Sequence, residues 1–230
     1  MQFIHRFKII VLSLIASSAI AWAQPNLEQY DNKWIHFGFS LTFNSASLRV
    51  DANTAALRKD SLRNVRQESF PGIGLGALTN FRLGKFLDLR VMLPQISFVQ
   101  RNLYYDFAGT QKLVKVESAY CDGSILLKYK SARRKNMRVY VIGGARASYD
   151  LASSINQNRS LASPVVSLIP FTYGTEFGAG LDIYFPYFKL SPELKFCNTY
   201  NNAVHYDGFI YTDVISRLTP QMVVFSLHFE

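Results

Sequence analysis

The stretch from Trp34 to Asn44 reads WIHFGFSLTFN and alternates at every second residue. Its large apolar side chains share one face: Ile35, Phe37, Phe39, Leu41 and Phe43. The opposite face is small or polar: His36, Gly38, Ser40 and Thr42. Successive side chains of a β-strand point to opposite faces, and lipid on one side with a crowded polar interior on the other produces this composition. The stretch therefore predicts a strand that crosses a bilayer.

Seven further segments repeat the alternation, at residues 71–83, 86–100, 114–130, 137–149, 172–184, 188–196 and 221–229. Pro94 predicts a bulge in the third strand, because proline cannot donate to the hydrogen-bond ladder. The pair Asp122-Gly123 predicts an interruption of the fourth. Eight strands is an even number and the smallest common size of a bacterial membrane barrel.

The connections between these segments predict how the strands are arranged. Residues 45–70, 101–113, 150–171 and 197–220 form long connections, whereas those near 83–85, 131–136 and 186–187 are short. A barrel with both termini in the periplasm alternates long external loops with short periplasmic turns, a rhythm that a soluble β-sandwich has no reason to keep. We therefore predict an all-β, eight-stranded antiparallel outer-membrane β-barrel with up-and-down topology and periplasmic termini.

The start of the chain predicts export. A basic leader precedes an apolar run that ends in Ala21-Trp22-Ala23, the pattern of a cleaved signal peptide. We assign residues 1–23 to the signal peptide and residues 24–230 to a single barrel domain. Hydrophobic residues make up 49% of the chain, yet the mean hydropathy is only +0.04, which favours interleaved strands over membrane helices. Cys121 and Cys197 are too few for a disulfide framework, and whether they pair stays open.

The formal net charge of +9 narrows the choice of partners. In a cytosolic protein such a charge would suggest nucleic acid, but export removes nucleic acid as a partner. Anionic lipid head groups, lipopolysaccharide phosphates or acidic protein surfaces are better candidates. The first long connection carries five cations that are suited to such contacts, although solvation explains them equally well: Arg49, Arg58, Lys59, Arg63 and Arg66.

Several motifs resemble one family of barrels. They are DNKWIHFGFS at residues 31–40, QRNLYY at 100–105, LLKYKS at 126–131, FPYFKLSPELK at 185–195 and FSLHFE at 225–230. Together they are similar to the PorT family of Bacteroidota, and the run from Phe185 to Lys195 is the most specific. The resemblance implies a barrel required for assembly or operation of the type IX protein secretion system, which exports cargo bearing C-terminal sorting domains. It implies other secretion components as partners and provides no catalytic residues. Cys121-Asp122-Gly123 departs from the more apolar family pattern.

Charged residues on the predicted inward face form the main candidate site: Asp88, Arg90, Lys128, Arg146, Glu176, Asp182, Lys189, Glu193 and Lys195. They would form either a transport path or binding pocket, or a network of paired charges that fills the interior. An eight-stranded barrel is only just wide enough for its own side chains. The sequence therefore favours the filling network.

Catalytic and metal sites find little support. His36 and His228 share the inward face and are predicted to meet where the barrel closes. Two histidines alone do not complete a metal site, so a hydrogen-bonded pair is favoured. His205 is the one histidine placed in an outward loop, and no serine is placed to join it in a catalytic triad. Gly72-x-Gly74-x-Gly76 lies within a strand, so relief of crowding explains it better than phosphate binding.

We predict no enzyme activity, no cofactor, no metal and no small-molecule substrate. The alternatives to a secretion role are a structural or adhesive outer-membrane barrel and, less favoured, a lipid-modifying barrel enzyme.

Overall fold

The computed structural model describes residues 26–27, 29–52, 62–107, 110–153, 168–206 and 215–230. The predicted signal peptide lies outside these residues. The elements are one 3-10 helix and eight strands: η1 (Tyr30–Asn32), β1 (Ile35–Ala52), β2 (Leu62–Arg82), β3 (Leu87–Phe107), β4 (Thr110–Lys130), β5 (Met137–Asp150), β6 (Phe171–Tyr184), β7 (Lys189–Thr199) and β8 (Ile215–Phe229). Among the described residues, no helix is long and apolar enough to cross a membrane.

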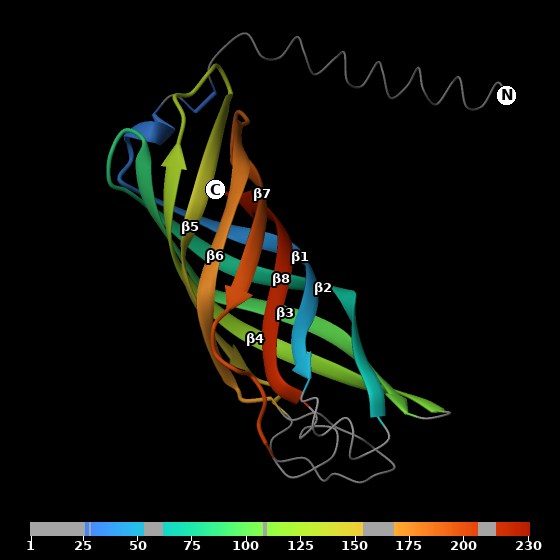
Figure 1. Ribbon diagram of the computed structural model, residues 1–230. Helices are drawn as coiled ribbons and strands as arrows, with labels where there is room; N and C mark the ends of the chain where they lie inside the picture. The colour runs from blue at the N-terminus through green and yellow to red at the C-terminus, as the bar shows by residue number, and fades with distance from the viewer. Residues whose placement is uncertain (1–25, 28, 53–61, 108–109, 154–167, 207–214) are drawn as a thin grey trace, which may run out of the picture.

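The eight strands form a closed antiparallel barrel in sequence order (Figure 1), which confirms the predicted fold. β1 closes the ring by pairing with β8, from Phe39 opposite Phe229 to Ala52 opposite Ile215. The turns at 83–86, 131–136 and 185–188 lie at one end, with η1 and Glu230, and we call it the short-turn end. We call the opposite end the long-loop end.

The outward and inward faces differ as the alternation predicts. On β1, Phe37, Phe39 and Phe43 are exposed, whereas Ser40 and Thr42 are fully buried. Every strand carries large apolar side chains on part of its outward face, as a bilayer requires. The interior is narrow: a Cβ added at Gly144 would lie 2.1 Å from the Ile125 carbonyl oxygen, so only glycine fits there.

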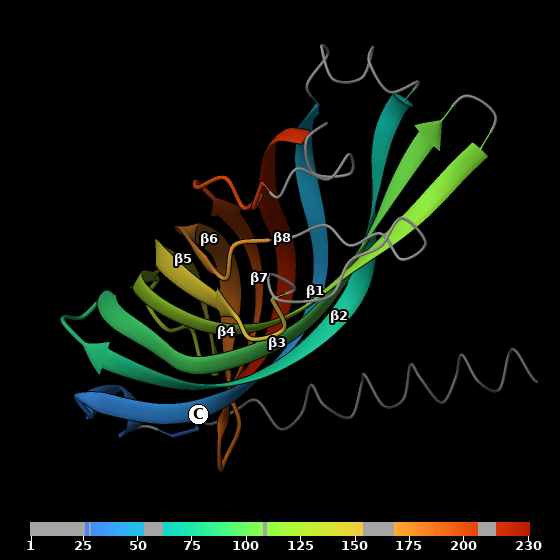
Figure 2. The same ribbon diagram turned by 90° about the horizontal axis from the view of Figure 1, so that it is seen from below.

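Six strands extend at least three residues further towards the long-loop end than predicted: β1, β2, β3, β4, β7 and β8. Residues 101–107 and 110–113 are not part of a long loop, because β3 and β4 continue pairing as far as Phe107 and Thr110. β2 parts from β1 beyond Phe70 and continues along β3 to Leu62. Figure 2 shows β2, β3 and β4 projecting past the other strands. The predicted alternation of long and short connections is therefore wrong between β3 and β4.

The alternation inverts in these extensions, which explains the error. The inward face becomes apolar and joins a buried cluster that includes Leu48, Leu103, Tyr105, Val114 and Val116. The outward face becomes polar, with exposed Arg49, Arg66, Glu68, Lys115 and Glu117. Outside a bilayer the outward face meets water, so the apolar face must turn inward. The pattern of apolar residues on the outward face ends at this boundary, so it does not predict the parts of the strands that lie beyond it.

Two local predictions have opposite outcomes. The strand register shifts between Met92 and Gln95, which confirms the bulge predicted at Pro94. The interruption predicted at Asp122-Gly123 is wrong, because β4 is continuous there. Asp122 points inward and is buried against Arg146, with 2.8 Å between carboxylate and guanidinium. Both cysteines are free thiols.

Candidate functional site in the barrel interior

The structure places the nine predicted charged residues on β3 to β7, pointing into the barrel. Eight are buried as whole residues: Asp88, Arg90, Lys128, Glu176, Asp182, Lys189, Glu193 and Lys195. The ninth, Arg146, has a side chain only 11% exposed. On β4 to β6, and on β3 as far as Met92, the inward residues are even-numbered, whereas on β7 they are odd-numbered, because each strand alternates in its own register. Beyond the register shift at Pro94, the odd-numbered residues of β3 face inward.

Glu193 is the hub of the interior. Its carboxylate accepts hydrogen bonds from Arg90 Nη1 at 2.8 Å and from Tyr140 Oη at 2.6 Å. His228 Nε2 lies 3.1 Å from its other oxygen. Arg90 also donates to Asn80 Oδ1 at 2.9 Å. Burying a carboxylate is costly unless it is paired and hydrogen-bonded, and these contacts satisfy both conditions.

Lys195 connects this hub to the middle of the barrel. Its ammonium lies 3.2 Å from Glu176 and 3.8 Å from Glu193, so one cation serves two carboxylates. Cys197 Sγ donates to Glu176 at 3.5 Å. The chain of contacts therefore continues along β7 towards the long-loop end.

Two further pairs lie nearer the short-turn end. Lys128 donates to both oxygens of Asp182 at 2.8 and 3.0 Å, and Ser191 Oγ donates to the same carboxylate at 2.7 Å. Lys130 binds Asp88 at 2.6 Å. Each of these carboxylates has a cation within hydrogen-bond distance, so the charges neutralise one another in pairs.

The mouth at the short-turn end is covered by η1. Asp31 accepts hydrogen bonds from Arg138 and from Tyr184 Oη, the latter at 3.1 Å. Tyr30 stacks on His36, with 4.0 Å between ring centroids, and donates to Glu230 at 3.0 Å. The segment before β1 therefore anchors to β5, β6 and the residue that follows β8.

Glu230 extends the network beyond the last strand. Its side chain is fully buried and lies 3.0 Å from Lys189 and 3.6 Å from Arg90. Burial alone would raise the pKa of this carboxyl group. Lys189 and then Arg90 outweigh burial and lower the pKa to about 2. Glu230 is therefore ionised throughout the physiological range.

Sequence reasoning missed Asp31, Arg138 and Glu230 as members of this network. The alternation of inward and outward side chains would have identified Arg138, which shares the inward face of β5 with Arg146. It could not have found Asp31 or Glu230, because both lie outside the strands and are positioned by tertiary contacts.

The predicted pairing of His36 with His228 is wrong. His228 lies opposite Ser40 and contacts Glu193, whereas His36 Nε2 contacts the Tyr30 carbonyl oxygen at 2.8 Å. Strands of a closed barrel are staggered, so the first residues of β1 extend past the last of β8. Within the described ranges, no cluster of three or more histidine, cysteine or acidic residues is arranged to hold a metal ion.

The predicted external cations are only partly described. Arg49 and Arg66 are exposed, but they lie on β1 and β2 and not in a loop, so that part of the prediction is wrong. Arg66 pairs with Asp106 at 3.1 Å, and Arg49 lies 4.0 Å from Asp51. Arg63 lies on β2. Arg58 and Lys59 lie outside the described residues.

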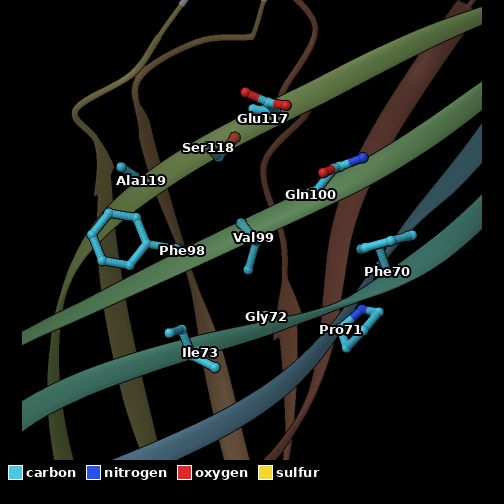
Figure 3. A pocket seen from close by; sticks show the side chains of 10 residues that line it. All are labelled: Phe70, Pro71, Gly72, Ile73, Phe98, Val99, Gln100, Glu117, Ser118 and Ala119. Atoms are coloured by element: carbon cyan, nitrogen blue, oxygen red, sulfur yellow. The ribbon is translucent and has the colours of Figure 1, made fainter.

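The outward surface carries a hollow of about 430 Å³ across β2, β3 and β4 (Figure 3). Phe70 and Ile73 of β2, Phe98 of β3 and Ala119 of β4 line it. The β2–β3 register shifts between Ser69 and Ile73, beside the hollow. The hollow belongs to the apolar exterior and not to the lumen.

Apolar side chains cover the interior at the long-loop end. Leu168, Ala203 and Val204 pack with Leu103 and Leu218 in one buried apolar cluster. The lumen is thus an ion-paired core with η1 at one end and apolar packing at the other. This arrangement can rigidify the barrel, and it positions no described side chain for chemistry on a bound molecule.

Three solved structures of outer-membrane and surface proteins are similar to this chain. OprG, an outer membrane protein of Pseudomonas aeruginosa, is 9% identical, with 85% of this chain and 90% of that chain covered and a TM-score of 0.46. Ail of Yersinia pestis, the attachment invasion locus protein, is 10% identical, with coverage of 84% and 96% and a TM-score of 0.39. Neisserial surface protein A is 8% identical, with coverage of 85% and 98% and a TM-score of 0.42.

No curated protein matches the chain. A family model described as an outer membrane protein beta-barrel domain matches residues 22–201, which is most of the sequence. Together with eight antiparallel strands in a closed ring, this match shows that the chain belongs to the outer membrane β-barrel domain family and resides in the outer membrane.

Proposed function

We propose that this barrel is a non-catalytic accessory protein that supports assembly or operation of the type IX secretion system. The observation that carries a binding or scaffolding role is the filled lumen: Glu193 and its partners are fully buried, and both ends of the interior are covered. Without an open interior, such a barrel acts through its rims and outward surfaces.

The secretion assignment rests on the PorT-like motifs. The most specific one, from Phe185 to Lys195, includes the β6–β7 turn and three members of the network, Lys189, Glu193 and Lys195. The motif at 225–230 ends with Glu230, which binds Lys189. These two motifs therefore meet at the short-turn end. A rim built from these motifs suits contacts with other secretion components.

We also propose that both termini are periplasmic. Bacterial barrels have short periplasmic turns and longer external loops, and η1 and Glu230 lie at the short-turn end. On this orientation, the projecting parts of β2, β3 and β4 extend outside the cell. Arg49, Arg63 and Arg66, together with Arg58 and Lys59, are then candidates for contact with lipopolysaccharide or a partner.

The projecting sheet is the observation that favours a second candidate, a structural or adhesive barrel. Adhesive barrels need surface that reaches beyond the membrane, and β2, β3 and β4 provide it (Figure 2). A lipid-modifying enzyme would need a nucleophile beside a base. His205 is exposed, but no such partner bonds to it among the described residues.

Deletion of the gene in its host tests the proposal, with the wild-type gene returned on a plasmid as the control. We expect sorting-domain cargo to accumulate in the periplasm and to return to the exterior on complementation. Normal secretion with altered adhesion would refute the secretion role and support the adhesive one. An altered lipid A profile with normal secretion would instead indicate the enzyme.

A further inference from the structure

Two hollows lie on either side of the β4–β5 turn at the short-turn end. The outer hollow, of about 390 Å³, has apolar walls from Met137, Val139 and Leu181, with Arg134 at its edge. The inner hollow, of about 330 Å³, is lined by five cations and one carboxylate: Arg82, Lys85, Lys130, Arg133, Arg138 and Asp31. Both hollows share Ser131, Ala132 and Arg138. The apolar outer hollow and the basic inner hollow are therefore neighbours, separated by one short turn.

The cations of this rim exceed the acids that face them. Asp31 binds Arg133 and Arg138, and Asp88 binds Lys130. In the described part of the chain, the side chains of Lys85, Arg134 and Lys135 are exposed and bind no carboxylate. Lys85 lies over the Phe86 ring, with 5.4 Å from the ammonium to the centroid. The rim thus presents positive charge that no described residue neutralises.

The same rim lies at the edge of the apolar belt. Trp34 and Tyr187 are 69% and 93% exposed at the short-turn end, and aromatic residues of this kind mark the interface of a bilayer with water. Val139 is 57% exposed on the outward face of β5, within the outer hollow. The basic side chains therefore sit at head-group depth and the groove at acyl-chain depth.

We propose that the short-turn rim binds an anionic phospholipid. Arg134 and Lys85 hold the phosphate-bearing head group, and the groove formed by Met137, Val139 and Leu181 holds the first part of an acyl chain. Guanidinium and ammonium groups are the usual donors to phosphate. A groove of this volume accommodates part of a lipid. An acidic protein segment would use the cations but would have no need of the lipid-depth groove, so the geometry favours the lipid.

Native mass spectrometry of the full chain, released from detergent micelles, tests the site with phosphatidylglycerol and neutral phosphatidylcholine at equal concentrations. Each cation near an anionic lipid strengthens binding about fivefold. We expect preferential retention of phosphatidylglycerol, reduced on the order of 25-fold by the double variant Lys85→Gln/Arg134→Gln. The matched control, Lys115→Gln/Arg217→Gln, removes the same charge from exposed sites at the other end and should retain the preference.

A second variant, Val139→Phe, keeps the charge and fills the outer hollow, and it should also weaken retention. All variants are first checked for the heat-dependent gel mobility of a folded barrel. Equal retention of both lipids by the wild type would overturn the proposal, as would the same loss in the control pair. Binding of polyglutamate that depends on Lys85 and Arg134, with phosphatidylglycerol retention unchanged, would indicate an acidic protein partner instead.

Discussion

Replacement of Glu193 by glutamine should destabilise the barrel strongly. The Glu193 and Arg90 side chains are fully buried and 2.8 Å apart. The amide would leave Arg90 with one carboxylate, that of Glu230, at 3.6 Å. Loss of one partner from a buried ion pair costs about 3 to 5 kcal/mol, because the remaining charge stays buried with less compensation. We expect a loss of this size in the free energy of unfolding.

The assay is urea unfolding of the protein folded into lipid vesicles, followed by the fluorescence of Trp34, with Asp51→Asn as the control. Asp51 lies 4.0 Å from Arg49, and these side chains are 49% and 68% exposed. Exposed pairs contribute about 0 to 1 kcal/mol, so the control should change stability by less than about 1 kcal/mol.

A double-mutant cycle separates the ion pair from other effects of the substitution. Arg90→Met combined with Glu193→Gln should cost less than the sum of the single changes, because each single change leaves an unpaired group. We expect a coupling energy of about 2 kcal/mol. A Glu193→Gln cost no larger than that of the control, with coupling near zero, would refute the view that paired charges hold the interior together.

Two further predictions concern crowding and pH. Gly144→Ala should cost about 1 to 3 kcal/mol of unfolding free energy, because its Cβ would lie 2.1 Å from the Ile125 carbonyl oxygen. Gly84→Ala, with nothing within 4 Å, should change the same urea midpoint very little, and equal effects would contradict the crowding argument. The folded pKa of Glu230, about 2 against the ordinary 4.5, gives it a contribution of about 3 kcal/mol that is fully present above pH 4.5. This contribution disappears as the pH falls towards 2, so wild type and Glu230→Gln should converge in stability over that range, and a constant difference would contradict the assignment.

The membrane-spanning parts were predictable because two environments constrain each strand. From Phe37 to Phe43 the exterior demands apolar residues and the crowded lumen demands small or polar ones, so the pattern has period two. The inward charges followed from the same parity, which located Arg90, Glu193 and their neighbours.

The remaining features depend on information that alternation does not contain. Leu48 and Leu103 point inward, because beyond the bilayer the apolar face reverses, and the strand ends were therefore missed. His36 and His228 are separated by the stagger between β1 and β8, which no single strand reveals. Asp31 and Glu230 enter the network from outside the strands, through contacts between residues far apart in the sequence.

The central claim is that side chains of one parity face lipid while those of the other face a packed, charged interior. Spin labels at single cysteines from residue 36 to 43, in a background free of Cys121 and Cys197, test it in lipid vesicles. Dissolved oxygen concentrates in the bilayer, so its collision rate with the label should peak at 37, 39, 41 and 43 and fall at 38, 40 and 42. A profile without this two-residue period, or one with a helical period of about 3.6 residues, would contradict the account.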